Sequence, residues 1–208
     1  MPDPCSRLFA VIPAAGFSRR MGQPKLLLPL GESNVISRLL AALQHPKIVE
    51  RCVIVRRDDR PLQASVEAAN AWCVSPEVDP ADMRQSVEFG LSEIRRRFSP
   101  DDQDGWLLVP ADYPVLTAEL IGLLIDAWLT RGSTILIPRC GERRGHPVLF
   151  RWSLACEVAQ IPADRGLNWL VERYSSEVDE LAVDHPSVLT DLDTVEDYER
   201  LRHENEHR

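Results

Sequence analysis

Short apolar runs that alternate with segments of helical spacing are the feature that most constrains the fold. The runs are LFAVIP at 8–13, CVIVR at 52–56, GWLLVP at 105–110, STILIP at 133–138 and HPVLF at 146–150. Helical spacing of apolar residues occurs between them, at 35–43, 85–94, 118–128 and 154–158. Strands that alternate with helices are typical of a mostly parallel sheet covered on both faces. We therefore predict an α/β fold in which helices flank such a sheet.

Three of the predicted strands end in proline, at Pro13, Pro110 and Pro138. Proline has no backbone N–H and interrupts the ladder of hydrogen bonds between strands. We expect these prolines to mark the carboxyl edge of the sheet, which is where ligands bind in open α/β sheets. The charged, turn-rich stretches at 56–61 and 95–105 are predicted to be solvated faces and loops.

Length, charge and cysteine content narrow the class of protein. The 208 residues are enough for one core, so we expect a single domain over 1–208, frayed at 1–7 and 202–208. A formal net charge of −8 argues against a broad nucleic-acid surface. The cysteines are odd in number and lack a C-x-x-C pair, which favours a reducing cytoplasm. No apolar run approaches the roughly 20 residues of a membrane span, so we expect a soluble protein.

A stretch of small residues follows the first predicted strand. Its short side chains would let a polyphosphate approach the backbone N–H groups closely, at Ala14, Ala15, Gly16 and Ser18. Positive charge follows at Arg19, Arg20 and Lys25. The stretch has neither the G-x-G-x-x-G pattern nor the spacing of a P-loop. We interpret it as a phosphate-binding loop of another kind, with an ordinary strand-to-helix turn as the alternative.

The same stretch, PAAGFSRRMGQPKLLLPLG, resembles the signature of the MobA-like nucleotidyltransferases, and within them the molybdenum cofactor cytidylyltransferases. Further family motifs are similar to DMRQSVEFGL (82–91), VPADYPVLTAELIGLLI (109–125), RRGHPVLF (143–150) and VLTDLDTVEDYERL (188–201). The segment DRGLNWLVE (164–172) matches the family's acceptor-contacting segment only loosely. The resemblance runs from Leu8 to Leu201 and implies a Rossmann-like nucleotide-diphospho-sugar transferase fold throughout.

The resemblance implies a Mg²⁺ site built on carboxylates. Asp112, directly after a strand, would be the primary ligand, and either Asp191 or Asp193 the second, with Asp193 slightly favoured. Mg²⁺ usually takes one or two carboxylates together with substrate phosphates. The alternative role for Asp112 is to cap the next helix, although Thr117 is better placed. For Asp191 and Asp193 the alternative is to cap the last helix with Thr194.

The resemblance also assigns the remaining site residues. Arg20 and Lys25 would bind the triphosphate and, with Asp112, form the catalytic set. Ser86 would lie near the base or ribose, with packing of its helix as the alternative. His146 would form a wall of the acceptor pocket, with a structural role as the alternative.

The reaction implied is transfer of CMP from CTP to the phosphate of molybdopterin, with release of pyrophosphate. The loop sequence AAG resembles the CTP-using branch of the family, whereas the guanylyltransferase branch carries AGG. The alternatives are another phosphorylated acceptor, such as a sugar phosphate, and a catalytically silent nucleotide-binding regulator. A molybdoenzyme or its chaperone is the protein partner that the resemblance suggests. HENEH at 203–207 matches a zinc motif, but it lies in a segment expected to fray, so we expect no zinc site.

Overall fold

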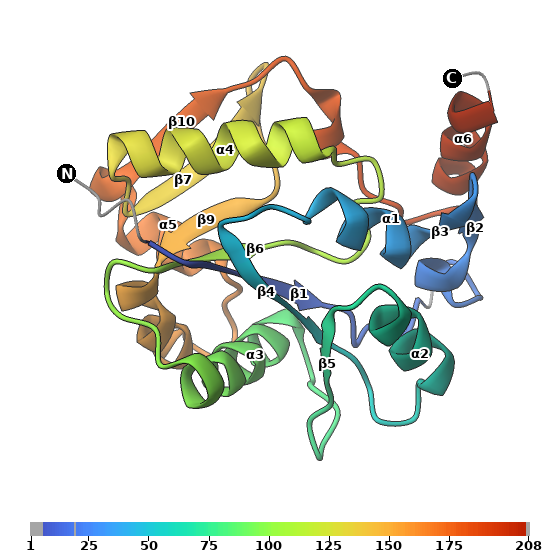
Figure 1. Cartoon of the computed structure of the whole chain (residues 1–208), viewed down its shortest axis with the longest axis horizontal. Coiled ribbons are helices and arrows are strands. Elements are labelled where there is room, and N and C mark those ends of the chain that lie inside the picture. The colour runs from blue at the N-terminus through green and yellow to red at the C-terminus, as the bar shows by residue number, and fades with distance from the viewer. Residues whose placement is uncertain (1–5, 19, 207–208) are drawn as a thin grey trace.

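A twisted sheet forms the centre of the molecule in the computed structural model, which describes residues 6–18 and 20–206. Within these residues eight strands build this sheet (Figure 1): β1 (Leu8–Pro13), β4 (Ile48–Ile54), β5 (Trp72–Val74), β6 (Gly105–Leu108), β7 (Ile135–Cys140), β8 (Arg143–Arg144), β9 (Val148–Arg151) and β10 (Val178–Ala182). Their order is β10-β7-β9-β6-β1-β4-β5, with β8 paired to β7. The strands β2 (Pro29–Leu30) and β3 (Ser33–Asn34) form a separate hairpin.

The sheet is mostly parallel, which confirms the predicted fold class. β1 is parallel to both β4 and β6, β5 is parallel to β4, and β10 is parallel to β7. Only β8 and β9 run antiparallel to their neighbours among the described strands of this sheet. Val11 of β1 pairs with Cys52 on one side and Leu108 on the other, so these strands end at a common carboxyl edge.

The expectation for the strand-ending prolines is only partly correct. β1 does end at Pro13, and β6 ends two residues before Pro110. β7, however, continues through Pro138 to Cys140, so the prediction that Pro138 ends its strand is wrong. The strand continues because residues beyond the proline pair with β8 in a hairpin. The carbonyl of Pro138 accepts a hydrogen bond from the N–H of Gly145 at 2.8 Å.

The described helices are α1 (Val35–Ala42), α2 (Arg60–Ala68), α3 (Met83–Phe98), α4 (Ala118–Arg131), α5 (Asn168–Arg173) and α6 (Val195–Glu206). The predicted helix at 154–158 is a 3₁₀ helix, Trp152–Gln160. Shorter 3₁₀ turns cover Lys25–Leu27, Ser175–Glu177 and Pro186–Leu189. Fraying at 1–7 and 202–208 stays a prediction, although α6 includes residues 202–206.

Two helices occupy parts of the charged stretches that were predicted to be loops. α2 begins inside the first, because the Asp59 side chain caps it by accepting the N–H of Leu62 at 3.2 Å and Pro61 fits its first turn. α3 extends into the second, where its last turn carries Arg95, Arg96 and Arg97 before the helix ends at Phe98. Cations stabilise the carboxyl end of a helix, so this charge is compatible with a helix terminus.

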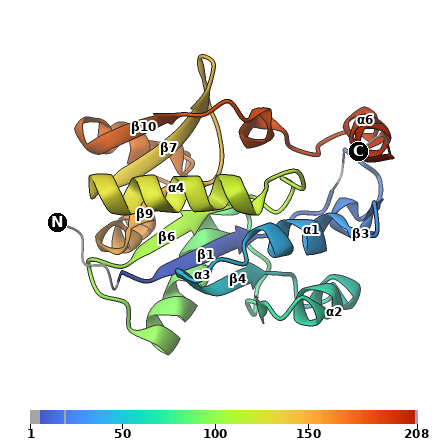
Figure 2. The ribbon, with the colours of Figure 1, turned by 45° about the horizontal axis from the view of Figure 1, so that its top comes forward.

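Helices cover both faces of the sheet (Figures 1 and 2), and each face carries its own hydrophobic core. Along β1, Leu8, Ala10 and Ile12 pack on the face covered by α1, α2 and α4. The alternate residues Phe9 and Val11 pack on the other face, which α3, α5 and the 3₁₀ helix Trp152–Gln160 cover. Burial on both faces explains why the strands are continuously apolar in sequence.

The amino edge of the sheet is held by an ion pair between Arg7 and Asp104, the residues that precede β1 and β6. The two charged groups lie 2.6 Å apart, and the Asp104 side chain is 3% exposed. The carboxylate also accepts the backbone N–H groups of Arg7 at 2.8 Å and Asp101 at 3.1 Å. These contacts fix the start of the first strand against the centre of the sheet.

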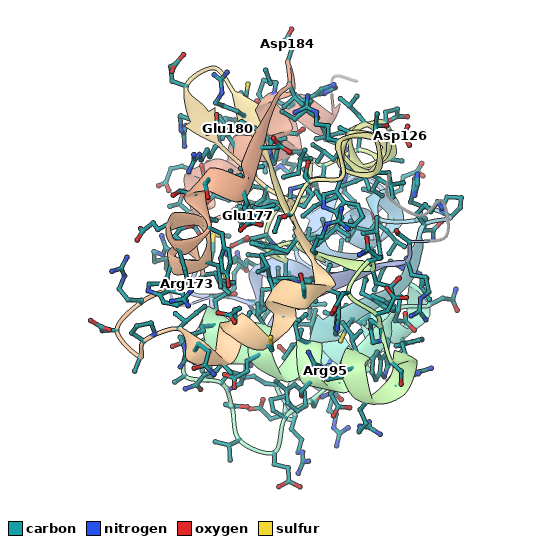
Figure 3. The ribbon with its side chains drawn as sticks, turned by 90° about the vertical axis from the view of Figure 1, so that its left-hand side faces the viewer. Arg95, Asp126, Arg173, Glu177, Glu180 and Asp184 are labelled. Carbon is teal, nitrogen blue, oxygen red and sulfur yellow. The ribbon has the colours of Figure 1, made fainter. Side chains whose placement is uncertain are left out.

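The outer surface carries charges of both signs. Exposed examples come from several elements (Figure 3): Arg95 of α3, Asp126 of α4, Arg173 of α5, Glu180 of β10, and Glu177 and Asp184 on either side of β10. Within residues 6–18 and 20–206, none of the helices has the length and apolar character needed to span a membrane.

Candidate active site

A pocket of about 640 Å³ lies at the carboxyl edge of the sheet. Its walls come from the loop after β1, the start of α3, the segment after β6 and the segment before α6. Most of the predicted site residues line it: Ala14, Ala15, Gly16, Ser18, Arg20, Lys25, Ser86, Asp112 and Asp193. Arg19 was also predicted to supply charge here, and it lies outside the described residues.

Lys25 joins two carboxylates that line this pocket. Its Nζ lies 2.6 Å from Oδ2 of Asp112 and 3.0 Å from Oδ1 of Asp193. Arg20 reaches the other oxygen of Asp193 at 2.9 Å, and its side chain is 74% exposed. Lys25, in contrast, is 15% exposed. The network therefore combines one shielded ammonium group with one guanidinium group that is open to solvent.

The carboxylates keep Lys25 charged. Burial alone would lower the pKa of Lys25, but attraction to Asp112 and hydrogen bonds to Asp112 and Asp193 outweigh it and raise that pKa above its usual value. The ammonium group is therefore protonated at neutral pH, available either to the carboxylates or to an anionic ligand.

The backbone places Asp112 beside the segment that carries Asp193. The carbonyl of Asp112 accepts the N–H of Leu192 at 2.8 Å, which ties the two segments together. The α4 helix is capped by Thr117, whose hydroxyl accepts the N–H of Leu120 at 3.3 Å. The side chain of Asp112 is thus not the cap of that helix, and it faces the pocket.

The start of α6 separates the roles of the neighbouring acidic residues. Thr194 accepts the N–H of Asp197 at 3.2 Å, and Asp197 accepts the N–H of Thr194 at 3.0 Å. This reciprocal cap leaves the side chain of Asp193 free to pair with Lys25. Asp191 is not among the described residues that line the pocket. The structure therefore brings Asp193, rather than Asp191, to Lys25 and Asp112.

A tight turn brings Lys25 back toward the end of β1. The N–H of Ala14 donates to the carbonyl of Ile54 at 2.9 Å, and the chain then turns at Ser18, which has a φ of 49°. The carbonyl of Ser18 accepts the N–H groups of Met21 at 3.0 Å and Gly22 at 3.1 Å, and its hydroxyl accepts the N–H of Lys25 at 3.4 Å. Ser18 was predicted only as a residue with a short side chain, but its hydrogen bonds also fix the shape of the loop.

Ser86 lies in the second turn of α3, buried and at the pocket wall. Its hydroxyl donates to the carbonyl of Asp82 at 3.2 Å, so both the predicted site role and helix packing remain compatible with its position. The pocket lining includes two large exposed apolar side chains that were not predicted as site residues: Phe17, 56% exposed, and Met83, 47% exposed. A large aromatic residue inside a run of small ones was the available signal for Phe17.

His146 is not among the described residues that line the pocket. Its ring packs edge-on against Tyr113, with the ring centres 5.3 Å apart, and Nδ1 is buried with no hydrogen-bond partner in the described part of the chain. Burial lowers the pKa of His146, so the ring is neutral at pH 7. Burial together with Asp191, Asp112 and Asp193 raises the pKa of Tyr113 to about 12. The role of His146 in the acceptor pocket stays a prediction. The ring of Tyr113 packs against that of His146.

The donor set fits a divalent cation that binds together with a nucleotide. Asp112 and Asp193 direct oxygen atoms at a single cation, the ammonium of Lys25. Residues 6–18 and 20–206 contain no group of three or more His, Cys, Asp or Glu side chains that could hold a metal. Mg²⁺ commonly completes its coordination with phosphate oxygens and water, so two carboxylates are sufficient for such a site.

Comparison with protein families adds to this geometry. The model of the MobA-like NTP transferase domain matches residues 10–178. The chain belongs to this family. The family membership expected from the sequence motifs is thereby confirmed, and the pocket of this MobA-like protein lies at the ligand-binding edge expected for its fold.

Similar proteins cover different shares of the chain. It is 33% identical over 132 residues to 2-C-methyl-D-erythritol 4-phosphate cytidylyltransferase of Tolumonas auensis, over 61% of this chain and 54% of that protein. The chain thus spans about half the length of this curated relative. The solved Rv0371c homologue from Mycobacterium sp. strain JC1 is 28% identical, with a TM-score of 0.79 over 97% and 98% of the two chains. The Mycobacterium tuberculosis Rv0371c complex with manganese is 26% identical, with a TM-score of 0.74 over 95% and 99%.

Proposed function

We propose that this MobA-like protein is a Mg²⁺-dependent nucleotidyltransferase that transfers CMP from CTP to the phosphate of molybdopterin and releases pyrophosphate. The observation that carries the proposal is the Lys25 ammonium held between Asp112 and Asp193 beside a loop of small residues. A triphosphate and a divalent cation need this combination of cationic groups, carboxylates and closely approachable backbone. The cytidylyltransferase name of the Tolumonas relative and the manganese complex of Rv0371c support the reaction class and the metal.

In the proposed reaction an oxygen of the acceptor phosphate attacks the α-phosphorus of CTP. A new P–O bond forms, and the bond from the α-phosphorus to the oxygen that bridges to the β-phosphate breaks, so the electron pair leaves with pyrophosphate. When bound, Mg²⁺ supplies positive charge to the phosphate oxygens. Lys25 is free to exchange its carboxylate contacts for phosphate contacts, and Arg20 reaches the phosphates from the exposed rim. Most of the catalysis would come from alignment and charge neutralisation.

The choice of CTP is proposed from the loop. Ala15 is 9% exposed and lines the pocket, so its methyl group narrows the space at a position where the guanylyltransferase branch has glycine. Ser86, on α3, also lines the pocket. An Ala15→Gly variant should therefore discriminate less between CTP and GTP, and a wild-type protein that turns over GTP faster than CTP would contradict the proposal.

A second acceptor class is favoured by one specific observation. The Tolumonas relative is named for 2-C-methyl-D-erythritol 4-phosphate, a phosphorylated polyol. The same pocket chemistry would serve such an acceptor, because the attacking group is again a phosphate oxygen.

The test is pyrophosphate release from CTP, GTP, ATP and UTP, each with molybdopterin cofactor, with 2-C-methyl-D-erythritol 4-phosphate and without acceptor. Each reaction is run with Mg²⁺, with Mn²⁺ and with a chelator. We expect release to need CTP, a divalent cation and molybdopterin. Pyrophosphate release with 2-C-methyl-D-erythritol 4-phosphate but not with molybdopterin would identify the polyol phosphate as the acceptor in place of molybdopterin. CTP binding without release in any mixture would instead identify a silent nucleotide-binding regulator.

A further inference from the structure

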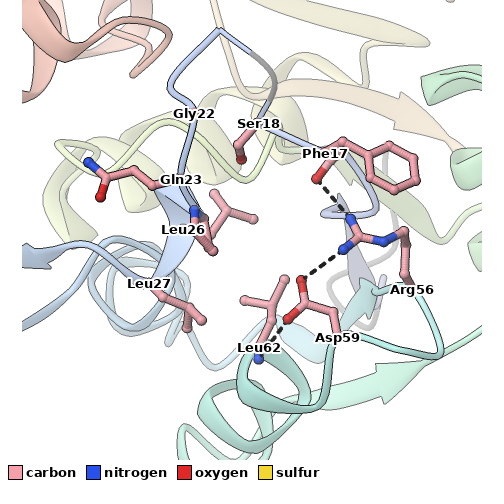
Figure 4. Close-up of a pocket in the computed structure, with 11 residues that line it drawn as sticks. Phe17, Ser18, Gly22, Gln23, Leu26, Leu27, Arg56, Asp59 and Leu62 are labelled. Carbon is pink, nitrogen blue, oxygen red and sulfur yellow. Dashed lines mark hydrogen bonds and ion pairs between the residues drawn. The ribbon is translucent and has the colours of Figure 1, made fainter.

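The loop after β1 is the wall between two pockets. The larger one holds Lys25 and the carboxylates, and a second pocket of about 260 Å³ lies against the same loop residues, Gly16, Phe17 and Ser18. Figure 4 shows this second pocket, with Arg56 and Asp59 at the side of α2. Arg56 lines only the smaller pocket, so it approaches the loop from the side opposite to the proposed phosphate site.

One guanidinium group contacts three successive residues of this loop. Nη1 of Arg56 donates to the carbonyl of Gly16 at 3.2 Å and to the carbonyl of Ala15 at 3.5 Å. The guanidinium carbon also lies 4.2 Å from the centre of the Phe17 ring. Arg56 therefore contacts both the backbone of the loop and the aromatic ring of Phe17.

The guanidinium is itself fixed by groups outside the loop. Nε lies 3.2 Å from Asp58 and Nη2 lies 3.5 Å from Asp59, and Asp59 is the cap of α2. The carbonyl of Arg56 accepts the side-chain amide of Gln63, also in α2, at 2.8 Å. With 13% of its side chain exposed, Arg56 has little freedom to move. Through Arg56, the loop after β1 is thus held in place relative to the amino end of α2.

Peptide geometry connects these contacts to the phosphate site. The C=O group and the following N–H group of a trans peptide point in opposite directions, and the described cis bond in this protein is elsewhere, at His146-Pro147. Carbonyls of Ala15 and Gly16 that are drawn to Arg56 direct the next N–H groups to the side of the loop where the larger pocket lies. Successive N–H groups with this orientation bind anions.

We propose that Arg56 is a positioning residue that orients the peptide groups of the loop for the triphosphate of the nucleotide. The inference rests on the proposed function, because it assumes that a nucleotide occupies the larger pocket. It assigns no contact between Arg56 and the nucleotide. The charged stretch at 56–61, expected from sequence to be solvated, then contains a residue that prepares the site.

The test compares Arg56→Gln and Arg56→Lys with Arg57→Gln, a matched control at the exposed neighbouring arginine. Calorimetry with CTP and Mg²⁺ should show roughly tenfold weaker binding for Arg56→Gln, because the loop carbonyls lose their charge-assisted contact and the loop N–H groups are no longer held toward the triphosphate. Arg56→Lys should be intermediate, because one ammonium cannot replace the fork of donors. In kinetics the KM for CTP should rise, while the KM for the acceptor stays unchanged.

A second measurement needs no nucleotide. In ¹H–¹⁵N spectra of the free protein, the amides of Gly16 and Phe17 should shift in Arg56→Gln and remain in place in Arg57→Gln. Wild-type CTP affinity together with unchanged loop amides in Arg56→Gln would overturn the inference. Absence of CTP binding in the wild-type protein would instead overturn the proposed function, and the amide spectra would still decide whether Arg56 sets the loop.

Discussion

Asp104 and Asp112 stand at opposite ends of β6, and each carboxylate has a cationic partner at 2.6 Å. The Asp104 side chain is 3% exposed and also accepts two backbone N–H groups, whereas that of Asp112 is 23% exposed and faces the pocket. Asp104 can exchange its partners only if the sheet opens. Asp112 can exchange Lys25 for a ligand without any change in the fold. Exposure and the kind of partner, rather than the ion-pair distance, separate the structural carboxylate from the proposed catalytic one.

The parallel register of the sheet explains both arrangements. Leu8 pairs with Gly105 and Val11 with Leu108, so the residues before β1 and β6 meet at one edge and those after them at the other. Arg7 and Asp104 are neighbours because they directly precede β1 and β6. The loop after β1 and Asp112 are neighbours because they follow the carboxyl ends of the same two strands.

The largest expected effect is that of Asp112→Asn. The change keeps the size of the side chain and removes the charge that we propose holds a divalent cation, so turnover should fall about 10²–10³-fold. The free energy of unfolding should change by less than about 1 kcal/mol, because Lys25 keeps its contact with Asp193. Pyrophosphate release and thermal unfolding are measured on the same preparation.

Asp126→Asn is the matched control, an exposed aspartate on α4. It should leave both turnover and stability unchanged. If Asp112→Asn behaved like this control, Asp112 would have no metal role.

Asp104→Asn makes the same chemical change at the other end of β6. It should lower the free energy of unfolding and leave turnover unchanged, the reverse of what we expect for Asp112→Asn. The amide cannot accept all the N–H groups that the carboxylate accepts, and its NH₂ group would face the Arg7 guanidinium. We expect a loss of about 2–3 kcal/mol in the free energy of unfolding. The loss is smaller than for a fully buried ion pair, because the Arg7 side chain is 37% exposed and solvent screens its charge. This corresponds to a fall in Tm of about 5–10 °C. Turnover well below the new Tm should stay at the wild-type rate, and a loss of activity in the folded variant would break the comparison.

Lys25→Ala should have opposite effects on the two ligands of the site. CTP binding should weaken by about 1.5–3 kcal/mol because a charge-assisted contact is lost. Mn²⁺ binding without nucleotide, followed by electron paramagnetic resonance, should strengthen, since the ammonium no longer competes for Asp112 and Asp193. Lys47, the only other lysine, supplies the control Lys47→Ala. Unchanged CTP affinity in Lys25→Ala would remove Lys25 from the nucleotide site.

Regular patterns in the sequence predicted much of the fold. The five apolar runs all overlap strands of the main sheet, because burial on both faces requires largely apolar residues. β5 and β10 were missed for physical reasons. β5 has only three residues, and β10 is an edge strand, VDELA, whose residues are half-buried or exposed. β5 leaves an apolar run of only four residues, at 71–74, and β10 is interrupted by two acidic residues.

The site was harder to obtain from local patterns. Lys25 and Asp193 are 168 positions apart, so no spacing rule could bring them together and only the family motifs connected them. Arg56 and Arg57 are neighbours in one charged stretch, and nothing in the sequence separates the buried loop contact from the exposed side chain. α2 did carry a signal, because Asp59 and Pro61 are typical of a helix start.

The smallest expected effect extends the comparison to the acidic residues before α6. Asp193 contacts Lys25 and Arg20, whereas Asp191 lies near Tyr113 and outside the described lining of the pocket. Asp193→Asn should therefore lower turnover and the affinity for Mn²⁺ in the presence of CTP. Asp191→Asn should change the free energy of unfolding by no more than about 0.5 kcal/mol, as expected for a substitution away from a tightly coupled group, and should leave Mn²⁺ affinity unchanged. Equal losses of metal affinity in the two variants would show that Asp191 also reaches the cation, and a loss in Asp191→Asn alone would move the second carboxylate from Asp193 to Asp191.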